Sequence, residues 1–261
     1  MLLAIDIGNS SISVGVFDIS DKLSPKIITH FKITVKDLSA DEYTVRIKDF
    51  LSRSSVCVDC AVISSVVPSL TETLSRAAQN LCGKQPFIIS NGIRTGFGIK
   101  IKNPEQLGTD IVSNVAAALQ NVDAPLAILD MGTATTLTVI DSNKYVLGTI
   151  IIPGLKIALD ALYDSAAQLS DIVLENDPEL IGRDTKSSIC SGIINGNALM
   201  IDGFIRNIRD ELKIKETGQI LGLVATGGLS NLILPHLRNK FAYDEFLTLK
   251  GQAYLYCINH K

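Results

Sequence analysis

The feature that most constrains the fold of this chain is a short glycine turn that occurs twice. The first copy reads Asp6-Ile7-Gly8-Asn9-Ser10-Ser11 and the second Asp130-Met131-Gly132-Thr133-Ala134-Thr135, so both have the form Asp-x-Gly-x-x-(Ser/Thr). Each copy follows an apolar run and precedes an alternating one, which predicts a strand, a tight turn and a strand. The glycine lets the backbone reverse and a ligand approach, the turn amides and hydroxyls can bind phosphate, and the aspartate can bind a cation. The repeat therefore predicts two related halves that face one nucleotide.

The composition argues against several classes of protein. Of the 261 residues, 46% are hydrophobic and 20% charged, a balance typical of a soluble globular protein. A net charge of -3 and a pI near 5.6 argue against a nucleic-acid-binding protein, which usually has a basic surface. No apolar run approaches the roughly 18 residues of a membrane helix, and Asp6 interrupts what would be the apolar region of a signal sequence. We therefore expect a cytoplasmic protein that binds neither nucleic acid nor membrane.

The five cysteines do not indicate a secreted disulfide framework, because their number is odd in a chain of this size. The pair Cys57-Val-Asp-Cys60 has the spacing of a redox or zinc motif, but no second such pair lies nearby in the sequence. We interpret the cysteines as structural, since free cysteine is common in protein cores.

The order of apolar patterns predicts a mixed α/β chain with a division near residue 120. Ser39 and Glu42 form a capping box, and Ser69 is expected to cap the next helix. The glycine-rich stretch 91–108 is more typical of a binding loop than of a simple connection. Strands are expected over 2–7, 11–17, 27–35, 59–67, 86–89, 126–140 (broken by the second turn), 145–152, 221–226 and 246–249. Helices are expected over 39–52, 69–82, 109–120, 155–168, 187–212, 230–240 and from 251 onward, with a polar loop over 170–184.

A third glycine turn and one acidic residue complete the candidate site. Ala225-Thr226-Gly227-Gly228 ends an apolar run, and three such turns at strand ends can hold a nucleotide, two at the phosphates and one at the adenosine. Asp110 lies where the glycine-rich loop meets a helix and is the candidate general base. The same position suits a structural role, because Thr109 can cap that helix and a carboxylate in its first turn is favoured by the helix dipole. Both interpretations of Asp110 stay open at this point.

Taken together, these residues resemble the type III pantothenate kinases, a family of the acetate kinase, sugar kinase and actin superfamily. The resemblance covers nearly the whole chain and depends on the order and spacing of many short motifs. These are Asp6-Ile7-Gly8-Asn9-Ser10, Asn103-Pro104, Gly108-Thr109-Asp110, Asp130-Met131-Gly132-Thr133-Ala134-Thr135, Pro153-Gly154, Gly182-Arg183-Asp184-Thr185, Ser191-Gly192, Asn195-Gly196, Ala225-Thr226-Gly227-Gly228 and Leu247-Thr248-Leu249-Lys250-Gly251.

The resemblance implies an α/β fold of two related ribonuclease H-like, actin-like halves, 1–120 and 121–261. Each half would be a mixed sheet with flanking helices, with the nucleotide in the cleft and the dimerisation helices in the second half. It also implies an activity, the ATP-dependent phosphorylation of the primary hydroxyl of pantothenate, which is the first step of coenzyme A synthesis. The family uses Mg²⁺ and a monovalent cation, K⁺ or NH₄⁺, and forms a homodimer with a shared active site. The apolar, glycine-bearing stretch Ile189–Ile205 is the candidate interface.

The resemblance further implies roles for single residues. Asp110 would accept the hydroxyl proton, Asp6 would lie near Mg²⁺, and Asp130 would bind the monovalent cation. ATP would be bound by Asp6, Ile7, Gly8, Asn9, Ser10, Ser11, Ile12, Ser13, Gly132, Thr133, Thr135, Gly227 and Gly228. Pantothenate would be bound by Gly108, Thr109, Asp110 and Ile111, and by Thr185 of the partner subunit.

The sequence departs from the family pattern on the pantothenate side. Ile111 stands where the family usually has an arginine that contacts pantothenate, a charge-assisted bond worth about 1.5–3 kcal/mol. A tyrosine is missing from 98–102, and Thr149 and Asp184 replace the usual glycine and asparagine. Two alternatives therefore stay open beside the kinase. One is a catalytically weak or inactive nucleotide-binding regulator, and the other is a kinase for another small hydroxyl compound.

Overall fold

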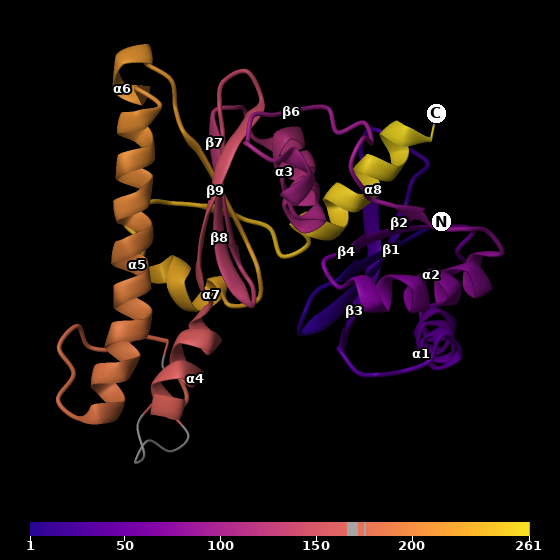
Figure 1. Ribbon diagram of the computed structural model, residues 1–261, viewed down its shortest axis with the longest axis horizontal. Coiled ribbons are helices and arrows are strands. Elements are labelled where there is room, and N and C mark those ends of the chain that lie inside the picture. The colour runs from indigo at the N-terminus through magenta and orange to yellow at the C-terminus, as the bar shows by residue number, and fades with distance from the viewer. Residues whose placement is uncertain (166–171, 175, 261) are drawn as a thin grey trace. The chain divides into compact units, whose positions relative to one another are not determined.

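The computed structural model describes residues 1–165, 172–174 and 176–260, and within them the chain forms two compact units (Figure 1). Unit 1 combines Met1–Asn121 with 246–260, and unit 2 is Val122–Glu245. The boundary after residue 121 lies one residue from the expected division. The C-terminal segment, however, packs with unit 1, whereas the sequence placed it in the second half.

Unit 1 is a five-stranded mixed sheet with helices on both faces. Its strand order is β3-β2-β1-β4-β5, in which β1, β2 and β3 are antiparallel neighbours and β4 and β5 run parallel to β1. The strands of this sheet are β1 (Leu2–Ile7), β2 (Ser11–Asp18), β3 (Lys26–Thr34), β4 (Cys60–Ser65) and β5 (Phe87–Ile88), and the short β6 (Gly98–Ile99) lies outside it. The helices are α1 (Ala40–Arg53), α2 (Pro68–Cys82), the 3₁₀ turn η1 (Pro104–Gln106), α3 (Thr109–Asn121) and α8 (Leu247–Asn259).

The alternation of β1 decides what lies on each face of this sheet. Leu3, Ile5 and Ile7 join the core that the sheet forms with α1 and α2. Because successive strand residues point to opposite faces, Asp6 points to the other face, on which α8 packs. The β1 carboxylate therefore faces the C-terminal helix.

Unit 2 repeats the plan of unit 1. Its strands lie in the order β11-β10-β7-β8-β9, again with three antiparallel neighbours and two strands parallel to the first. The strands are β7 (Leu126–Met131), β8 (Ala134–Ile140), β9 (Tyr145–Pro153), β10 (Gly222–Thr226) and β11 (Ala242–Tyr243). The helices are α4 (Leu155–Ser165), α5 (Thr185–Glu211), α6 (Ile214–Thr217), α7 (Ser230–Ile233) and the 3₁₀ turn η2 (Leu234–His236). The two sheets confirm the expected pair of related α/β halves.

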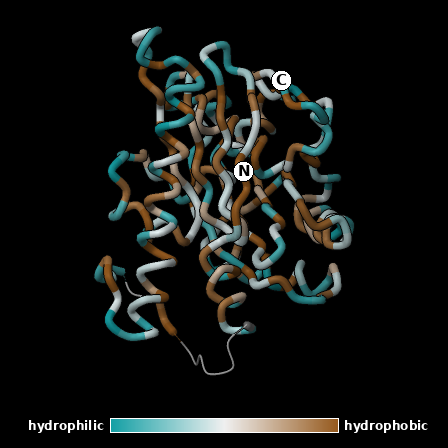
Figure 2. Tube along the Cα trace, turned by 60° about the vertical axis from the view of Figure 1, so that its left-hand side comes forward, coloured by the Kyte–Doolittle hydropathy of each residue, from teal (hydrophilic) through white to brown (hydrophobic). Residues whose placement is uncertain are grey.

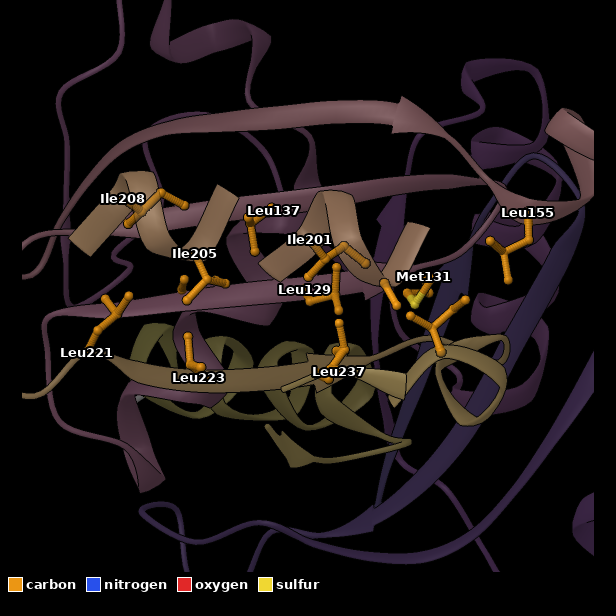
Figure 3. Close-up of a cluster of buried hydrophobic side chains, with 14 of the residues drawn as sticks. Leu129, Met131, Leu137, Leu155, Ile201, Ile205, Ile208, Leu221, Leu223 and Leu237 are labelled. Carbon is orange, nitrogen blue, oxygen red and sulfur yellow. The ribbon is translucent and has the colours of Figure 1, made fainter. Parts of the chain in front are cut away.

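The core of unit 2 lies between the long helix α5 and the sheet. Figure 3 shows Ile201, Ile205 and Ile208 of α5 directed toward strand residues such as Leu129 and Leu223. Along the chain, apolar stretches follow the strands and the inner helix faces, and polar stretches follow the loops (Figure 2). Among the described helices, α5 alone is long and apolar enough to cross a membrane, with 39% of the window buried. Its place in this core accounts for the apolar residues that it buries.

Most expected elements are present, and three details differ. Val67, not Ser69, is the N-cap of α2, because Pro68 takes the first helical position. The expected helix over 230–240 ends early, since Pro235 falls in η2 and cannot continue the α-helical hydrogen bonds. The expected strand over 246–249 is the start of α8. The expected residues 166–168 of α4 and residues 170, 171 and 175 of the polar loop lie outside the described residues.

Candidate active site

The first glycine turn joins β1 to β2 as a tight hairpin. The Gly8 amide donates to the Ser11 carbonyl oxygen at 3.0 Å. Neither Gly8 nor Gly132 has a positive φ, so the reversal itself does not require glycine there. Asn9 and Ser10 are exposed at the tip, which makes the turn accessible to a ligand. The side chains of Ile7 and Ile12 lie in the core of unit 1, so these two residues offer a ligand only their backbone.

Asp6, at the start of this turn, contacts the C-terminal helix. The Gln252 side-chain amide Nε2 donates to Asp6 Oδ1 at 3.0 Å. In the sheet, Asp6 pairs with Ser13 of β2 and with Ser64 of β4. Gln252 is fully buried and did not stand out in the sequence, because nothing in its local pattern links it to a residue 246 positions away.

Thr109 fastens the start of α3 to the end of β4. Its Oγ1 accepts a hydrogen bond from the Ser65 backbone N–H at 3.1 Å and lies 3.1 Å from the Ser65 carbonyl oxygen. The same atom is 3.0 Å from Ser64 Oγ, the residue that pairs with Asp6. The hydroxyl thus bonds to the neighbouring strand, and Thr109 is the first residue of α3 rather than its expected cap.

Asp110 follows in the first turn of α3. Its Oδ1 accepts from the backbone N–H of Ile111 at 2.8 Å, which fixes the carboxylate over Gly108. A Cβ on Gly108 would clash with that oxygen, so the glycine is required for this arrangement. Burial raises the pKa of the Asp110 carboxyl above its ordinary value, although the Ile111 amide acts in the opposite direction. A more basic, oriented carboxylate suits a proton acceptor.

The neighbours of Asp110 along the chain are a buried isoleucine and the glycine-rich loop that precedes α3. The Ile111 side chain is buried in unit 1, and its backbone N–H is used by Asp110. The glycine-rich loop before α3 lines a cavity of about 370 Å³ together with Val112 of α3. Phe97, Ile99 and Pro104 contribute to its walls. The loop therefore forms a hollow close in sequence to the candidate base.

The second glycine turn, between β7 and β8, is enclosed by backbone from two other segments of unit 2. A Cβ on Gly154 would clash with the carbonyl oxygen of Thr133. Gly227 has a φ of +96°, and a Cβ there would lie 2.6 Å from the Met131 backbone. The second and third turns of the sequence, with Pro153-Gly154, therefore meet at one place. Gly132, Thr133 and Gly228 are exposed there.

Asp130 and Thr135 lie on opposite faces of the sheet of unit 2. Asp130 pairs with Thr136 of β8 and Thr226 of β10, so oxygen-bearing side chains flank its position. Thr135 is 2% exposed, and its buried Oγ1 has no hydrogen-bond partner among the described residues. By strand alternation its side chain shares a face with the core residue Leu137. This burial favours an interior position for the hydroxyl that was expected to contact ATP.

Thr185 is the first residue of α5 and is exposed. Asp184 before it is the N-cap, and its side chain accepts from the Ser187 amide at 2.8 Å. That hydrogen bond lowers the pKa of the Asp184 carboxyl. The capping explains why α5 begins two residues before the expected start at Ser187.

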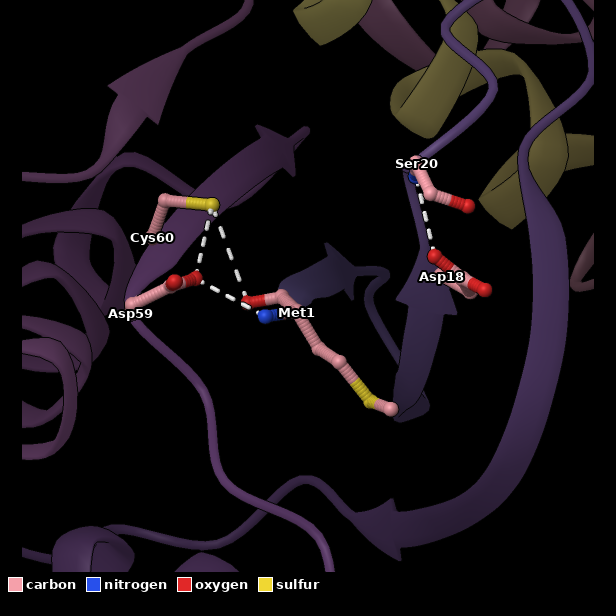
Figure 4. Close-up of polar contacts among 5 residues, drawn as sticks. All are labelled: Met1, Asp18, Ser20, Asp59 and Cys60. Atoms are coloured by element: carbon pink, nitrogen blue, oxygen red, sulfur yellow. Dashed lines mark hydrogen bonds and ion pairs between the residues drawn. The ribbon is translucent and has the colours of Figure 1, made fainter.

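The cysteines have no catalytic environment among the described residues. All five are free thiols, and burial raises the pKa of Cys82 to about 12 and also that of Cys60. Figure 4 shows Cys60 directed toward Asp59 and the carbonyl oxygen of Met1, while the N-terminal amine pairs with Asp59 at 2.9 Å. No group of three or more His, Cys, Asp or Glu side chains that could hold a metal occurs in the described part of the chain.

Comparisons with known proteins give one consistent result. The model of the type III pantothenate kinase family matches residues 2–207. A type III pantothenate kinase of an Exiguobacterium species is 34% identical over the full length of both chains. The enzyme of Dictyoglomus turgidum is 36% identical, covering 99% of this chain and 100% of its own.

Solved structures show the same fold. A conserved putative Baf family transcriptional activator from Campylobacter jejuni superimposes with a TM-score of 0.58 at 19% identity, covering 98% of each chain. The ethanolamine utilization protein EutJ from Carboxydothermus hydrogenoformans gives 0.51 at 13% identity, covering 97% of this chain and 89% of its own.

Proposed function

The chain belongs to the type III pantothenate kinase family, and from this we propose how its residues divide the transfer of a phosphoryl group from ATP to pantothenate. The family establishes the reaction as the phosphorylation of pantothenate for coenzyme A synthesis, with ATP and a divalent metal ion. The kinase expectation is therefore confirmed, despite the departures at Ile111, Thr149 and Asp184.

Asp110 is the proposed general base, and the arrangement at the start of α3 carries this proposal. Its Oδ1 is fixed by the Ile111 amide, its pKa is raised by burial, and its backbone is fastened through Thr109. In the reaction the pantothenate hydroxyl oxygen bonds to the γ-phosphorus as the bond to the bridging oxygen breaks and ADP leaves. The carboxylate of Asp110 takes the hydroxyl proton. The hollow beside the 91–108 loop is the proposed place for the acceptor.

Asp6 is the proposed ligand of the divalent ion, which we take to be Mg²⁺. Mg²⁺ is usually bound by one or two carboxylates together with substrate phosphates and water, so a single aspartate beside an accessible phosphate turn fits it. When bound, the ion neutralises charge on the transferring phosphoryl group. The first turn binds phosphate through its amides and hydroxyls, and Gly132, Thr133, Gly227 and Gly228 bind the rest of ATP.

Asp130 is the proposed ligand of K⁺ or NH₄⁺. In the register of the sheet, Asp130 lies between Thr136 and Thr226. The hydroxyl oxygens of these threonines are of the kind that can coordinate a cation. Asp130→Asn should raise the K⁺ concentration needed for half-maximal activity. An unchanged K⁺ dependence would remove Asp130 from this role.

A homodimer is proposed from the exposed stripe on α5. Gly192, Gly196, Leu199 and Met200 are exposed and recur at the spacing of one helix face. A Cβ on Gly192 or Gly196 would meet no atom of the described residues within 4 Å, which leaves room for a second copy to approach closely. Thr185 of the partner subunit would then reach the substrate. Gly196→Arg should yield a monomer in sedimentation velocity, and a dimer would refute this interface.

The direct test of the catalytic assignment is a coupled ADP-release assay with Mg²⁺, K⁺, ATP and pantothenate. Asp110→Asn should lower kcat by about 100- to 10,000-fold, the usual contribution of general-base catalysis. ATP affinity should be unchanged, because the substitution leaves the nucleotide turns intact. Retention of wild-type kcat in Asp110→Asn would refute Asp110 as the base.

We further propose that the enzyme works in the cytoplasm, where coenzyme A synthesis needs ATP.

A further inference from the structure

We propose that Gln252 of the C-terminal helix α8 is a positioning residue of the kinase, because it holds the Asp6 carboxylate in place for the cation and phosphates of ATP. This inference rests on the proposed role of Asp6. The amide is not expected to touch a substrate and would act only through Asp6.

The contact is specific and internal to unit 1. Gln252 Nε2 donates to Asp6 Oδ1 at 3.0 Å, and Gln252 is 0% exposed. A fully buried side chain has few alternative rotamers, so its amide is a fixed donor. An oriented donor fixes the rotamer of the carboxylate that it bonds.

Gln252 would lower the stability of the folded state if its role were only structural. Its carbonyl oxygen Oε1 is buried and has no hydrogen-bond partner within the part of the chain that the structure describes, which disfavours the folded state. The other buried residues of α8 are Leu247, Leu249, Gly251, Ala253, Leu255 and Cys257. An apolar side chain would suit this helix face better than an amide of which only one end is bonded. The bonded end points at Asp6, and this contact is what the glutamine adds.

The helix that carries Gln252 is locked to the helix that carries the base. A Cβ on Gly251 would clash with the backbone of Ser113 in α3, so the two helices approach at the backbone. Beside this crossing, Thr248 Oγ1 donates to Asn114 Oδ1 at 2.7 Å. The α3–α8 pair therefore positions both carboxylates, Asp110 because it lies on α3 and Asp6 because it is bonded to Gln252 of α8. The close backbone approach at Gly251, rather than the Thr248 hydrogen bond beside it, would keep the cation-binding carboxylate and the base in register.

The test compares Gln252→Met with Thr248→Val. Methionine approximates the shape of glutamine but has no donor, whereas Thr248→Val removes a hydrogen bond of the same helix that does not involve Asp6. Calorimetry measures ADP binding with Mn²⁺ and without metal, and the ratio of the two affinities is the readout. A general loss of structure lowers both affinities together, so it does not change the ratio.

Gln252→Met should lower the ratio about tenfold, the lower end of the effect for partners of metal ligands. It should also raise the Mg²⁺ concentration for half-maximal turnover, while Thr248→Val keeps the wild-type ratio. Gln252→Leu provides a second apolar variant if the first does not fold, and it should behave in the same way. A wild-type ratio in a folded Gln252 variant overturns the inference, and so does an equal loss in Thr248→Val.

Asp6→Asn separates this inference from the proposed function. A lowered ratio in Asp6→Asn with a wild-type ratio in Gln252→Met would reject the role of Gln252 alone. Wild-type binding and turnover in Asp6→Asn would reject the role of Asp6, and with it the inference.

Discussion

The attachment of α3 to β4 through Thr109 gives a prediction whose size follows from the structure. Valine at this position keeps the branched shape of threonine and loses only the hydroxyl. Thr109→Val therefore removes the acceptor of the Ser65 N–H and the partner of Ser64 Oγ, both at the end of β4. Ser64 is 0% exposed, so water does not readily replace the lost bond.

A buried polar group left without a partner costs about 1–3 kcal/mol. We expect Thr109→Val to lower the free energy of unfolding by about 2 kcal/mol, near the middle of that range. For a chain of this size such a loss lowers Tm by roughly 4–8 °C. Loosening of this attachment should also displace Asp110, and a displacement of about 1 Å can reduce turnover about 100-fold.

The assays are thermal unfolding and steady-state kinetics with pantothenate, and Thr109→Ser is the matched control. Serine keeps the oxygen and loses one methyl group, so it should retain most of both the stability and kcat. If Thr109→Val and Thr109→Ser behave alike, the hydroxyl does not fasten α3. If valine lowers Tm but leaves kcat unchanged, the attachment is structural and does not position the base.

Four further predictions follow from three residues, Asp110, Thr135 and Gly154. Because burial raises the pKa of Asp110, the acid limb of the pH profile of kcat/KM should have a pKa above the ordinary range of an aspartate. An acid limb with a pKa within that range would contradict this. By linkage, ionised Asp110 costs stability as the pH rises from its unfolded to its folded pKa, so Asp110→Asn should be the more stable form at neutral pH in urea unfolding. Thr135→Val should raise the free energy of unfolding by about 1 kcal/mol, because it removes an unpaired buried hydroxyl. A higher KM for ATP in Thr135→Val would instead support the expected nucleotide contact. Gly154→Ala should destabilise by about 1–3 kcal/mol and raise the KM for ATP, since its methyl group meets the Thr133 carbonyl; wild-type values for both would refute the close approach.

The two hairpins could be predicted because their signals are local. An apolar run, a glycine turn and an alternating run specify strand, turn and strand within about 15 residues, and both copies fold in this way. The capping box of Ser39 and Glu42 was likewise confirmed, because all of its atoms lie within one helical turn.

The start of α8 could not be read in the same way. Phe246-Leu247-Thr248-Leu249 alternates like a strand, yet Leu247 begins α8, in which Leu247 and Leu249 are buried and Thr248 bonds to Asn114 of α3. Tertiary packing overrides local propensity in such short segments. The same long-range packing places Gln252 beside Asp6, which a sequence pattern does not reveal.

The two copies of the glycine turn are supported by different kinds of contact, and this difference predicts how each fails. Around the first copy the support comes from side chains, since Gln252 holds Asp6 and Thr109 holds the strand beside it. Around the second copy it comes from backbone, since Gly154 and Gly227 approach too closely for any Cβ. Removal of side-chain atoms should therefore impair the first turn, whereas addition of one methyl group should impair the second. One sequence motif thus gives an oriented carboxylate in unit 1 and a rigid backbone surface in unit 2, which are the two elements that phosphoryl transfer requires, charge neutralisation and fixed position.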